Sequence, residues 1–371
     1  MSVLGRYVSR HILVRLLVIL FLIVAFEVSF DLVDRADRVL AAYPGDPGAL
    51  ARYVALRVPG LLADLIPIAA LLGALLGIGD LLRNRELVAS WTMGVSPTML
   101  MRRLVPLALA LAVAQVVLGE AVLPPASRAL AAMGFADSRQ GVLTASAEGA
   151  VWIRDGPDIV RAIPANAREA EKAISIFRLD RDGLLVERLD ARWAVPADGG
   201  GWILQDVVRR AVGAPEVEHA DELPYWGTLN LGHLDLLATD ARDLPLRDLL
   251  RVLASGATGS RPMSLYLTWT IYRVVSPLAP ALMIMLAVAL AQHFERTGGM
   301  TRLLVRGGSI GFAYLILDQT AVALGEVDTI PPWIAAPGTS VALAGLIAWL
   351  VVRRRGRVQD VRHHGAAAAA A

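Results

Sequence analysis

The sequence predicts an α-helical membrane protein with six transmembrane helices and an inserted all-β domain. Two observations predict this fold class: the apolar composition, and the way long apolar runs flank an acidic middle segment. Hydrophobic residues make up 56% of the chain and charged residues 19%, whereas a soluble domain has about 45–50% and about 25%. The 371 residues also exceed the roughly 100–200 of one domain, so more than one structural unit is expected.

Six apolar runs approach the about 20 residues that a membrane-spanning helix needs. They are residues 12–30, 61–79, 105–123, 274–291, 303–324 and 334–352. The second run contains Pro67, and the fourth contains Pro277 and Pro280. Prolines are tolerated in such helices because neighbouring helices satisfy the carbonyl groups that they free.

Arginines collect on one side of the membrane in this arrangement. They lie before the first run, between the second and third, between the fourth and fifth, and after the sixth: Arg6, Arg10, Arg15; Arg83, Arg85, Arg102, Arg103; Arg296, Arg302, Arg306; Arg353, Arg354, Arg355 and Arg357. Because cytoplasmic loops are enriched in Lys and Arg, we expect both termini in the cytoplasm and the long middle segment on the opposite side.

That middle segment, residues 135–262, has the pattern of β structure. It carries 15 Lys+Arg and 20 Asp+Glu, and its short runs rich in Val, Ile, Leu and Trp are separated by turn sequences such as Asp180-Arg-Asp-Gly183. The runs are residues 150–154, 173–179, 184–189, 192–195 and 201–208. We expect a sandwich or jelly roll, followed by a helix or linker at 243–260.

The chain therefore divides into four parts. Residues 1–134 hold three spans and a cytoplasmic segment at 83–95, and residues 135–262 hold the β domain with its linker. Residues 263–355 hold the last three spans, and residues 356–371 form a cytoplasmic tail.

Several kinds of chemistry are excluded by what the sequence lacks. There is no cysteine, which excludes disulfides, thiolate metal sites and cysteine nucleophiles. The single lysine, Lys172, follows no glycine-rich loop, so the chain has no phosphate-binding P-loop of its own. The six histidines are scattered and the net charge is only +2, so we expect no metal, no cofactor and no nucleic-acid partner.

One pattern resembles that of an enzyme. Gly307-Gly-Ser-Ile-Gly311 fits G-x-S-x-G, with Ser309 as nucleophile and His293 as the nearest candidate base. The same spacing of Gly307 and Gly311 also suits close helix packing, which is the simpler interpretation. Gly73 and Gly77 repeat that spacing in the second span.

The segment 84–95 joins the second and third spans. Asn84 is expected to cap a short helix whose first turn holds Glu86. Leu87, Trp91 and Val95 recur every four residues and form an apolar stripe. Such a helix either lies on lipid or docks into a groove of a soluble partner, and the residues alone leave both interpretations open.

Acidic residues also occur within the spans, where ionisable groups are costly and often functional. Glu27, Asp64 and Glu120 lie toward the outer ends, whereas Asp318 is deeper. The alternative for each is a structural hydrogen bond to another helix.

These features together resemble the LptF/LptG family, the permease subunits of the lipopolysaccharide exporter. The matching pieces run through nearly the whole chain in order: Pro67-Ile-Ala-Ala-Leu-Leu-Gly-Ala-Leu-Leu-Gly77, Arg85-Glu-Leu-Val88 with Gly94, Leu317-Asp-Gln319, Ile330-Pro-Pro332, and Val33-Asp34. Several of them are closer to the LptG branch than to the LptF branch.

The resemblance implies an ATP-driven exporter in the bacterial inner membrane. A permease of this kind pairs with a second, LptF-like permease and with an LptB-like ATPase dimer, which binds the ATP. It extracts lipopolysaccharide from the outer leaflet and passes it along periplasmic β-jelly-roll domains to LptC-like and LptA-like proteins. The coupling helix would be residues 83–95, with contact residues Arg83, Arg85, Glu86, Leu87 and Trp91.

One departure concerns the lipid. Family members can carry a basic residue near the outer end of the first span, where this chain has Asp31. Arg35, Arg38 and Arg128 are the candidates to bind lipid phosphates instead. Two alternatives to the exporter permease remain: an intramembrane serine hydrolase using Ser309, and a non-transporting envelope scaffold.

Overall fold

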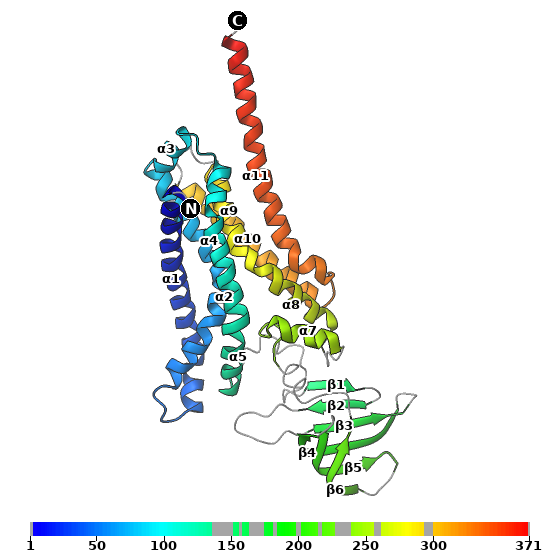
Figure 1. Cartoon of the computed structure of the whole chain (residues 1–371). Coiled ribbons are helices and arrows are strands. Elements are labelled where there is room, and N and C mark those ends of the chain that lie inside the picture. Colours follow the sequence, from blue (N-terminus) through cyan, green and yellow to red (C-terminus); the bar gives the residue numbers. More distant parts are fainter. Residues whose placement is uncertain are drawn as a thin grey trace. The chain divides into compact units, whose positions relative to one another are not determined.

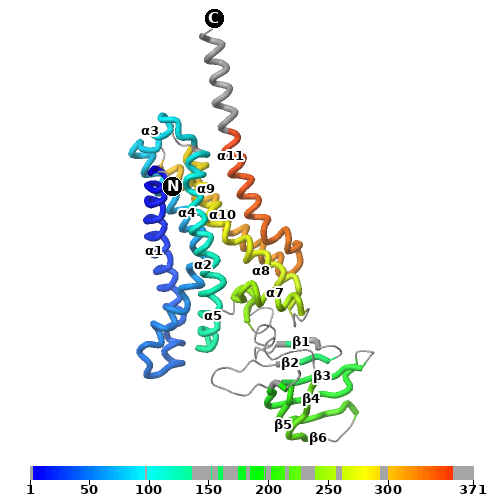
Figure 2. The backbone as a smooth tube through the Cα atoms, viewed as in Figure 1, coloured from blue at the N-terminus to red at the C-terminus, as the bar shows by residue number. Residues whose placement is uncertain are grey.

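The computed structural model describes residues 3–135, 151–155, 158–162, 174–180, 184–197, 202–213, 217–226, 239–255, 261–292 and 300–369. Figure 1 shows the helices and strands, and Figure 2 traces the same backbone. The chain separates into two compact units, one helical and one built around a sheet.

The helical unit contains residues 1–122, 271–325 and 330–371. Its elements are α1 (Val3–Ala42), α2 (Ala49–Arg83), α3 (Glu86–Thr92), α4 (Pro97–Val117), the π-helical turn η1 (Leu118–Val122), the end of α8 (Met263–Val275), the 3₁₀ turn η2 (Ser276–Leu278), α9 (Ala279–Ala291), α10 (Met300–Glu326) and α11 (Pro332–Ala369). The turn η2 begins next to Pro277, where the proline prevents regular α-helix.

Among the residues that the structure describes, six helical stretches are long and apolar enough to cross a membrane, which confirms the predicted number. They are Val3–Ala42, Ala49–Arg83, Thr98–Ala132, Met263–Ala291, Met300–Glu326 and Pro332–Arg353. Each extends beyond its predicted apolar run at one or both ends. The prediction of an α-helical membrane protein with an inserted β domain is confirmed.

Helices α2 and α9 form the centre of the helical unit. The most apolar stretches of α2 and of α8–α9 are each 61% buried, whereas that of α1 is only 11% buried. Helix α1 packs on α2 through a stripe at every fourth residue: Val8, Ile12, Leu16 and Leu20. Its other faces expose large apolar side chains, as expected of a helix that meets lipid or another membrane chain.

Glycines permit this close packing. A Cβ atom at Gly73 would lie 2.7 Å from the backbone Cα of Leu16, and one at Gly77 would lie 3.2 Å from Cγ1 of Ile12. The predicted small-residue contact therefore joins α2 to α1.

The second unit contains residues 123–270 and 326–329. Its helices are α5 (Leu123–Ala132), α7 (Leu246–Ser255) and the start of α8; its strands are β1 (Val151–Asp155), β2 (Asp158–Ala162), β3 (Ile174–Leu179), β4 (Leu185–Pro196), β5 (Trp202–Ala211) and β6 (Val217–Tyr225). The strands form one antiparallel sheet in the order β1-β2-β3-β4-β5-β6. Every neighbour in the sheet is thus a neighbour in sequence, because short connections favour hairpins.

The inserted segment thus contains a β domain, as predicted, and the strands that the structure describes form a meander. A jelly roll has two sheets, with connections that cross from one sheet to the other. The predicted jelly roll therefore stays a prediction. Two expected runs, 184–189 and 192–195, are continuous in β4, and the expected helix or linker at 243–260 contains α7. Strands β2 and β6 were not predicted. Strand β6 is polar, largely exposed and contains Pro224, which suits the sheet edge that it occupies.

Candidate functional site

The segment between α2 and α4 forms a hairpin that contains the short helix α3 and lies beside the N-terminus of the chain (Figure 1). Two residues in left-handed conformations reverse the chain: Arg85 with φ 60° before α3 and Gly94 with φ +90° after it. Glycine adopts this conformation at no steric cost, whereas arginine does not. The hydroxyl of Ser96 caps α4 by accepting a hydrogen bond from the Met99 amide at 3.2 Å.

The predicted cap at Asn84 is wrong. Asn84 is the C-cap residue of α2, and its backbone amide donates to the carbonyl of Asp80, while Arg85 occupies the position before α3. Helix α2 continues about one turn beyond its predicted apolar run and ends at Arg83.

The apolar stripe of the hairpin faces the helical unit. Leu87 is 2% exposed, Ser90 is buried with its hydroxyl donating to the Leu87 carbonyl, and Trp91 packs against the buried core of the bundle. Two of the five predicted coupling residues therefore anchor α3 to the chain's own spans. This contact packs the hairpin onto the helical unit.

The opposite face of the hairpin is exposed and polar. Arg83, Arg85 and Glu86 are exposed, and Met93 is 78% exposed at the tip. A surface of charges with one large apolar side chain suits a soluble protein partner better than the acyl region of a membrane.

One polar contact connects this hairpin to α1, and a second connects the adjoining end of α2 to α1. The hydroxyl of Tyr7 donates to Oε2 of Glu86 at 2.9 Å. The guanidinium of Arg15 contacts the carboxylate of Asp80 at 2.5 Å, and Arg83 approaches the same carboxylate at 3.6 Å. The position of Glu86 thus depends on α1 as well as on α3.

At the other end of α1, Asp31 organises a cluster with residues of α2. The Tyr53 hydroxyl donates to Oδ2 of Asp31 at 2.5 Å, and Oδ1 faces the guanidinium groups of Arg35 at 3.4 Å and Arg57 at 3.8 Å. One carboxylate therefore faces two half-buried cations, so the cluster has a net charge of about +1. The acid at position 31 thus contacts Arg35 and leaves the cluster basic.

The other two candidates for lipid binding lie in different surroundings. Arg38 makes an exposed pair with Asp34 one turn earlier, at 3.2 Å. Arg128 on α5 lies 3.6 Å from Oδ2 of the buried Asp248 on α7. Each of the three predicted lipid-binding arginines thus contacts a different acidic residue.

Asp318 is buried among hydroxyl groups. The hydroxyl of Tyr272 donates to its Oδ2 at 2.9 Å, and that of Thr339 donates to its Oδ1 at 2.5 Å. A second hydroxyl pair, Tyr314 and Ser340, lies on the same helices at 3.2 Å. The carboxyl group therefore connects α8, α10 and α11, which supports the structural interpretation.

The G-x-S-x-G pattern lies on α10 with its glycines facing inward. A Cβ atom at Gly307 would lie 2.6 Å from Cδ1 of Leu75, while Ser309 is on the exposed face. A Cβ atom at Gly311 would meet Leu71 in the same way. The glycines serve helix packing; His293 lies outside the described residues.

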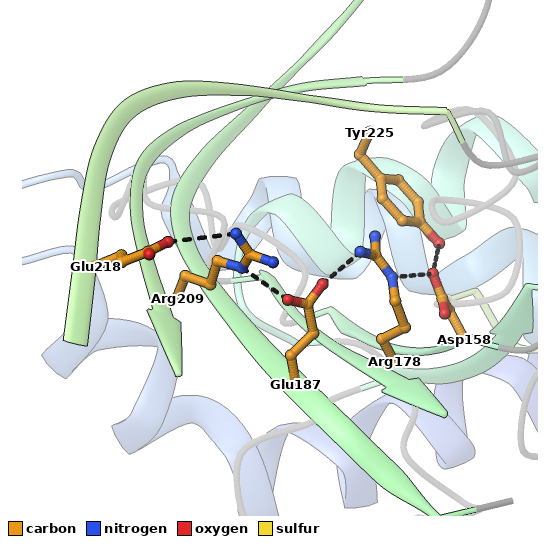
Figure 3. A network of polar contacts seen from close by, with 6 residues as sticks. All are labelled: Asp158, Arg178, Glu187, Arg209, Glu218 and Tyr225. Atoms are coloured by element: carbon orange, nitrogen blue, oxygen red, sulfur yellow. Dashed lines mark hydrogen bonds and ion pairs between the residues drawn. The ribbon is translucent and has the colours of Figure 1, made fainter. Parts of the chain in front are cut away.

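The sheet carries a ladder of alternating charges across five strands (Figure 3). It comprises Asp158, Arg178, Glu187, Arg209 and Glu218, and the hydroxyl of Tyr225 donates to Asp158 at 3.1 Å. Glu187 is buried between two arginines, and its hydrogen bond raises the pKa of the Arg209 guanidinium. The ladder adjoins the apolar face formed by residues such as Ile176 and Leu189.

Several residues of these sites were not predicted. Tyr7, Asp80, Tyr53, Tyr272 and Thr339 gain their contacts from helices that are distant in sequence, so no local pattern identifies them. Within the described residues, no group of three or more His, Cys, Asp or Glu side chains could hold a metal ion.

Comparison with known proteins points in one direction. The family model described as lipopolysaccharide export system permease LptF/LptG matches residues 6–353. The chain is 28% identical to the lipopolysaccharide export system permease protein LptG of Escherichia coli K12 over 364 residues, which cover 95% of this chain and 99% of the relative. The LptG protein of Haemophilus influenzae is 24% identical over 361 residues, with the same two shares covered.

Proposed function

The chain belongs to the LptF/LptG family of lipopolysaccharide export permeases, and on that premise we propose that it is the LptG-like subunit of an ATP-driven exporter. It is a multi-pass inner-membrane protein of a transport system, not a catalytic enzyme. In the proposed transport cycle it extracts lipopolysaccharide from the outer leaflet and delivers it to a chain of periplasmic β-jelly-roll domains.

The main support for this proposal is the packing of the α3 hairpin, which has one face on the helical unit and one exposed face. Its inner face is fixed to the helical unit by Leu87 and Trp91, and its outer face presents Glu86, Arg85 and Arg83. A short helix that packs on the spans and exposes charged side chains can transmit a movement of its partner to the membrane helices. This is the arrangement that a coupling helix requires.

The partner must supply the energy, because the chain has no P-loop sequence. We therefore assign ATP binding to an LptB-like ATPase dimer at the α3 end of the helices. That end, with both termini, lies in the cytoplasm in this account, and the sheet unit lies in the periplasm. A second, LptF-like permease would cover the exposed apolar faces of peripheral helices such as α1.

The lipid path starts at the opposite end of α1 and α2. Arg35 and Arg57, held by Asp31, offer guanidinium groups to lipid phosphates, and Arg38 and Arg128 are the other candidates. The apolar face of the sheet, with Ile176, Leu189 and their neighbours, would receive acyl chains before LptC-like and LptA-like proteins do.

ATP-dependent extraction of lipopolysaccharide tests this function. The chain is reconstituted in proteoliposomes with its ATPase, the second permease and a soluble acceptor, and the lipopolysaccharide on the acceptor is quantified. Glu86→Lys is expected to lower ATP-dependent transfer by at least about tenfold, because the substitution removes one charge contact that the bound ATPase would bury. The matched control is Glu218→Lys on β6, an acid that is also exposed.

Unchanged transfer by Glu86→Lys would contradict the coupling role and favour the scaffold interpretation. Loss of transfer in Ser309→Ala, with ATPase binding intact, would instead favour the hydrolase.

A further inference from the structure

The first turns of α1 present three polar side chains to the corner where α2 leads into α3. Tyr7, His11 and Arg15 recur at every fourth residue, so they share one face of the helix. The ring centroids of Tyr7 and His11 lie 4.6 Å apart, and Nη1 of Arg15 donates to the His11 carbonyl at 3.1 Å. We call these three residues the polar row of α1.

The polar row contacts both arms of the corner. Tyr7 donates to Glu86, which lies in the first turn of α3. Arg15 donates from Nε and from Nη2 to Oδ2 of Asp80, at 3.1 Å and 2.5 Å. Asp80 lies in the last turn of α2, where its carbonyl accepts a hydrogen bond from the Asn84 amide at 2.9 Å. Helix α1 is therefore connected to the end of α2 and to the start of α3.

The ion pair of Arg15 and Asp80 is not required to pack α1 on α2. Its side chains are 27% and 26% exposed, and the cost of taking two charges out of water often exceeds their attraction. Apolar contact already joins the two helices, because Ile12 lies directly on Gly77 one turn before Asp80. The ion pair adds direction: two N–H donors of one planar guanidinium group fix how α1 is turned relative to the last turn of α2.

Helix α1 is also the span that is held least by the rest of the chain. The most apolar stretch of α1 is 11% buried, whereas that of α2 is 61% buried. A displacement of α1 therefore breaks fewer of the chain's own contacts than a displacement of α2 would. Since the start of α1 lies beside α3 (Figure 1), a movement of the hairpin reaches α1 directly through the polar row.

We propose that Arg15 is a positioning residue whose ion pair with Asp80 passes a displacement of the α3 hairpin to α1. The inference rests on the proposed function, because it takes α3 as the contact with the ATPase, and it adds the helix on which α3 acts. Without the pair the ATPase still binds and still hydrolyses ATP, but less of the hydrolysis leads to transfer of lipid.

The amount of lipid transferred per ATP hydrolysed distinguishes a positioning role from a structural one. This ratio is measured in proteoliposomes that hold the full complex, and the thermal midpoint of each variant is measured in detergent. Arg15→Leu with Asp80→Leu replaces the pair by apolar side chains, and Arg83, which also approaches Asp80, is 73% exposed and stays in water. We expect an unchanged midpoint, a bound ATPase and a ratio that falls by about fivefold.

The matched control removes an ion pair at the other end of α2. Arg52→Leu with Asp46→Leu breaks a contact of 3.4 Å between α2 and the connection that precedes it, and we expect the wild-type ratio. The single variants Arg15→Leu and Asp80→Leu each leave one partly buried charge unpaired, so the thermal midpoint should fall. Their ratio should fall as far as that of the double variant, because the pair is absent from all three.

A wild-type ratio in the double leucine variant overturns the proposal, and so does an equal fall in the control. Should the double variant not fold, Arg15→Lys decides, because lysine keeps the charge but has no planar group of donors. A fall of about twofold in its ratio supports the positioning role, and an unchanged ratio overturns it.

This inference and the proposed function fail in different experiments. Glu86→Lys changes the exposed face of the hairpin, whereas the variants of Arg15 and Asp80 leave that face as it is. Unchanged transfer in Glu86→Lys contradicts the proposed function. Loss of transfer in Glu86→Lys, together with a wild-type ratio in the double leucine variant, contradicts only the role of Arg15.

Discussion

Helices α2 and α3 are consecutive in the chain and are held in opposite ways. Helix α2 lies in the interior, where Gly73 and Gly77 bring its backbone against α1. Helix α3 has one buried leucine, one buried serine and a hydroxyl contact to Glu86, and its outer face is exposed. The difference indicates that α2 supplies stability, whereas α3 supplies a surface that can act on a partner without loss of the fold.

The largest effect is expected where α2 meets α1. In Gly73→Leu the Cβ atom alone would lie 2.7 Å from the Cα atom of Leu16. This clash is with backbone, which cannot move aside by changing rotamer as a side chain can. We expect a loss of about 3 kcal/mol or more in stability, measured as a lower midpoint of thermal unfolding in detergent. Gly345→Leu is the control, because a Cβ atom there meets nothing within 4 Å; equal losses in both variants would break the comparison.

A smaller effect on stability is expected from Asp318. In Asp318→Leu the hydroxyl groups of Tyr272 and Thr339 lose their acceptor, which costs about 1–2 kcal/mol within a membrane protein. Asp318→Asn keeps one acceptor oxygen and should retain about half of that stability. If both variants unfold like the wild type, the carboxyl group is not a structural connection, and its role in transport would need a test of its own.

At the far end of α1, substitution should affect lipid rather than the fold. Arg35→Glu with Arg38→Glu replaces two cations by anions, and we expect lipid photo-cross-linking to fall by about tenfold while assembly with the partners continues. Arg35→Glu alone should account for most of the loss, because Arg35 lies in the cluster around Asp31 whereas Arg38 makes an exposed pair. Unchanged cross-linking would remove both arginines from the head-group site.

The smallest effect is expected from Tyr7→Phe, which removes only the exposed hydrogen bond to Glu86. We expect no change in the thermal midpoint and a decrease of about twofold in ATP-dependent lipid transfer, since Glu86 keeps its charge but loses one orienting partner. A loss as large as that of Glu86→Lys would mean that the hydroxyl group itself belongs to the contact surface.

The sequence predicted the six spans and the inserted β domain because both depend on a one-dimensional pattern of apolar residues. It missed β6, whose acidic residues and Pro224 suit a sheet edge that only pairing with β5 defines. It predicted Asn84 as the N-cap of α3 because asparagine is a common N-cap residue. In the structure α2 extends through Arg83, so Asn84 is the C-cap of α2.

For the candidate site, the sequence singled out Glu86 and the arginines but did not indicate which residues contact them. Leu87 and Trp91 looked like a docking stripe because spacing shows a face and not what covers it; the structure covers that face with the core of the bundle. Partners such as Tyr7 for Glu86 and Asp31 for Arg57 are set by helix packing across long separations in sequence. Asp248, by contrast, carried no sequence signal, because its burial and its contact with Arg128 depend on how α5 and α7 pack.

The central claim is that α3 couples the spans to a separate ATPase, and the composition of the intact complex tests it most directly. The chain is co-expressed with its native partners, extracted in mild detergent and weighed by native mass spectrometry. The account predicts a mass that contains two ATPase subunits and a second permease, and loss of the ATPase subunits in Glu86→Lys with the two permeases still paired. A complex that keeps both ATPase subunits in Glu86→Lys, or a wild-type chain that binds none, would contradict it.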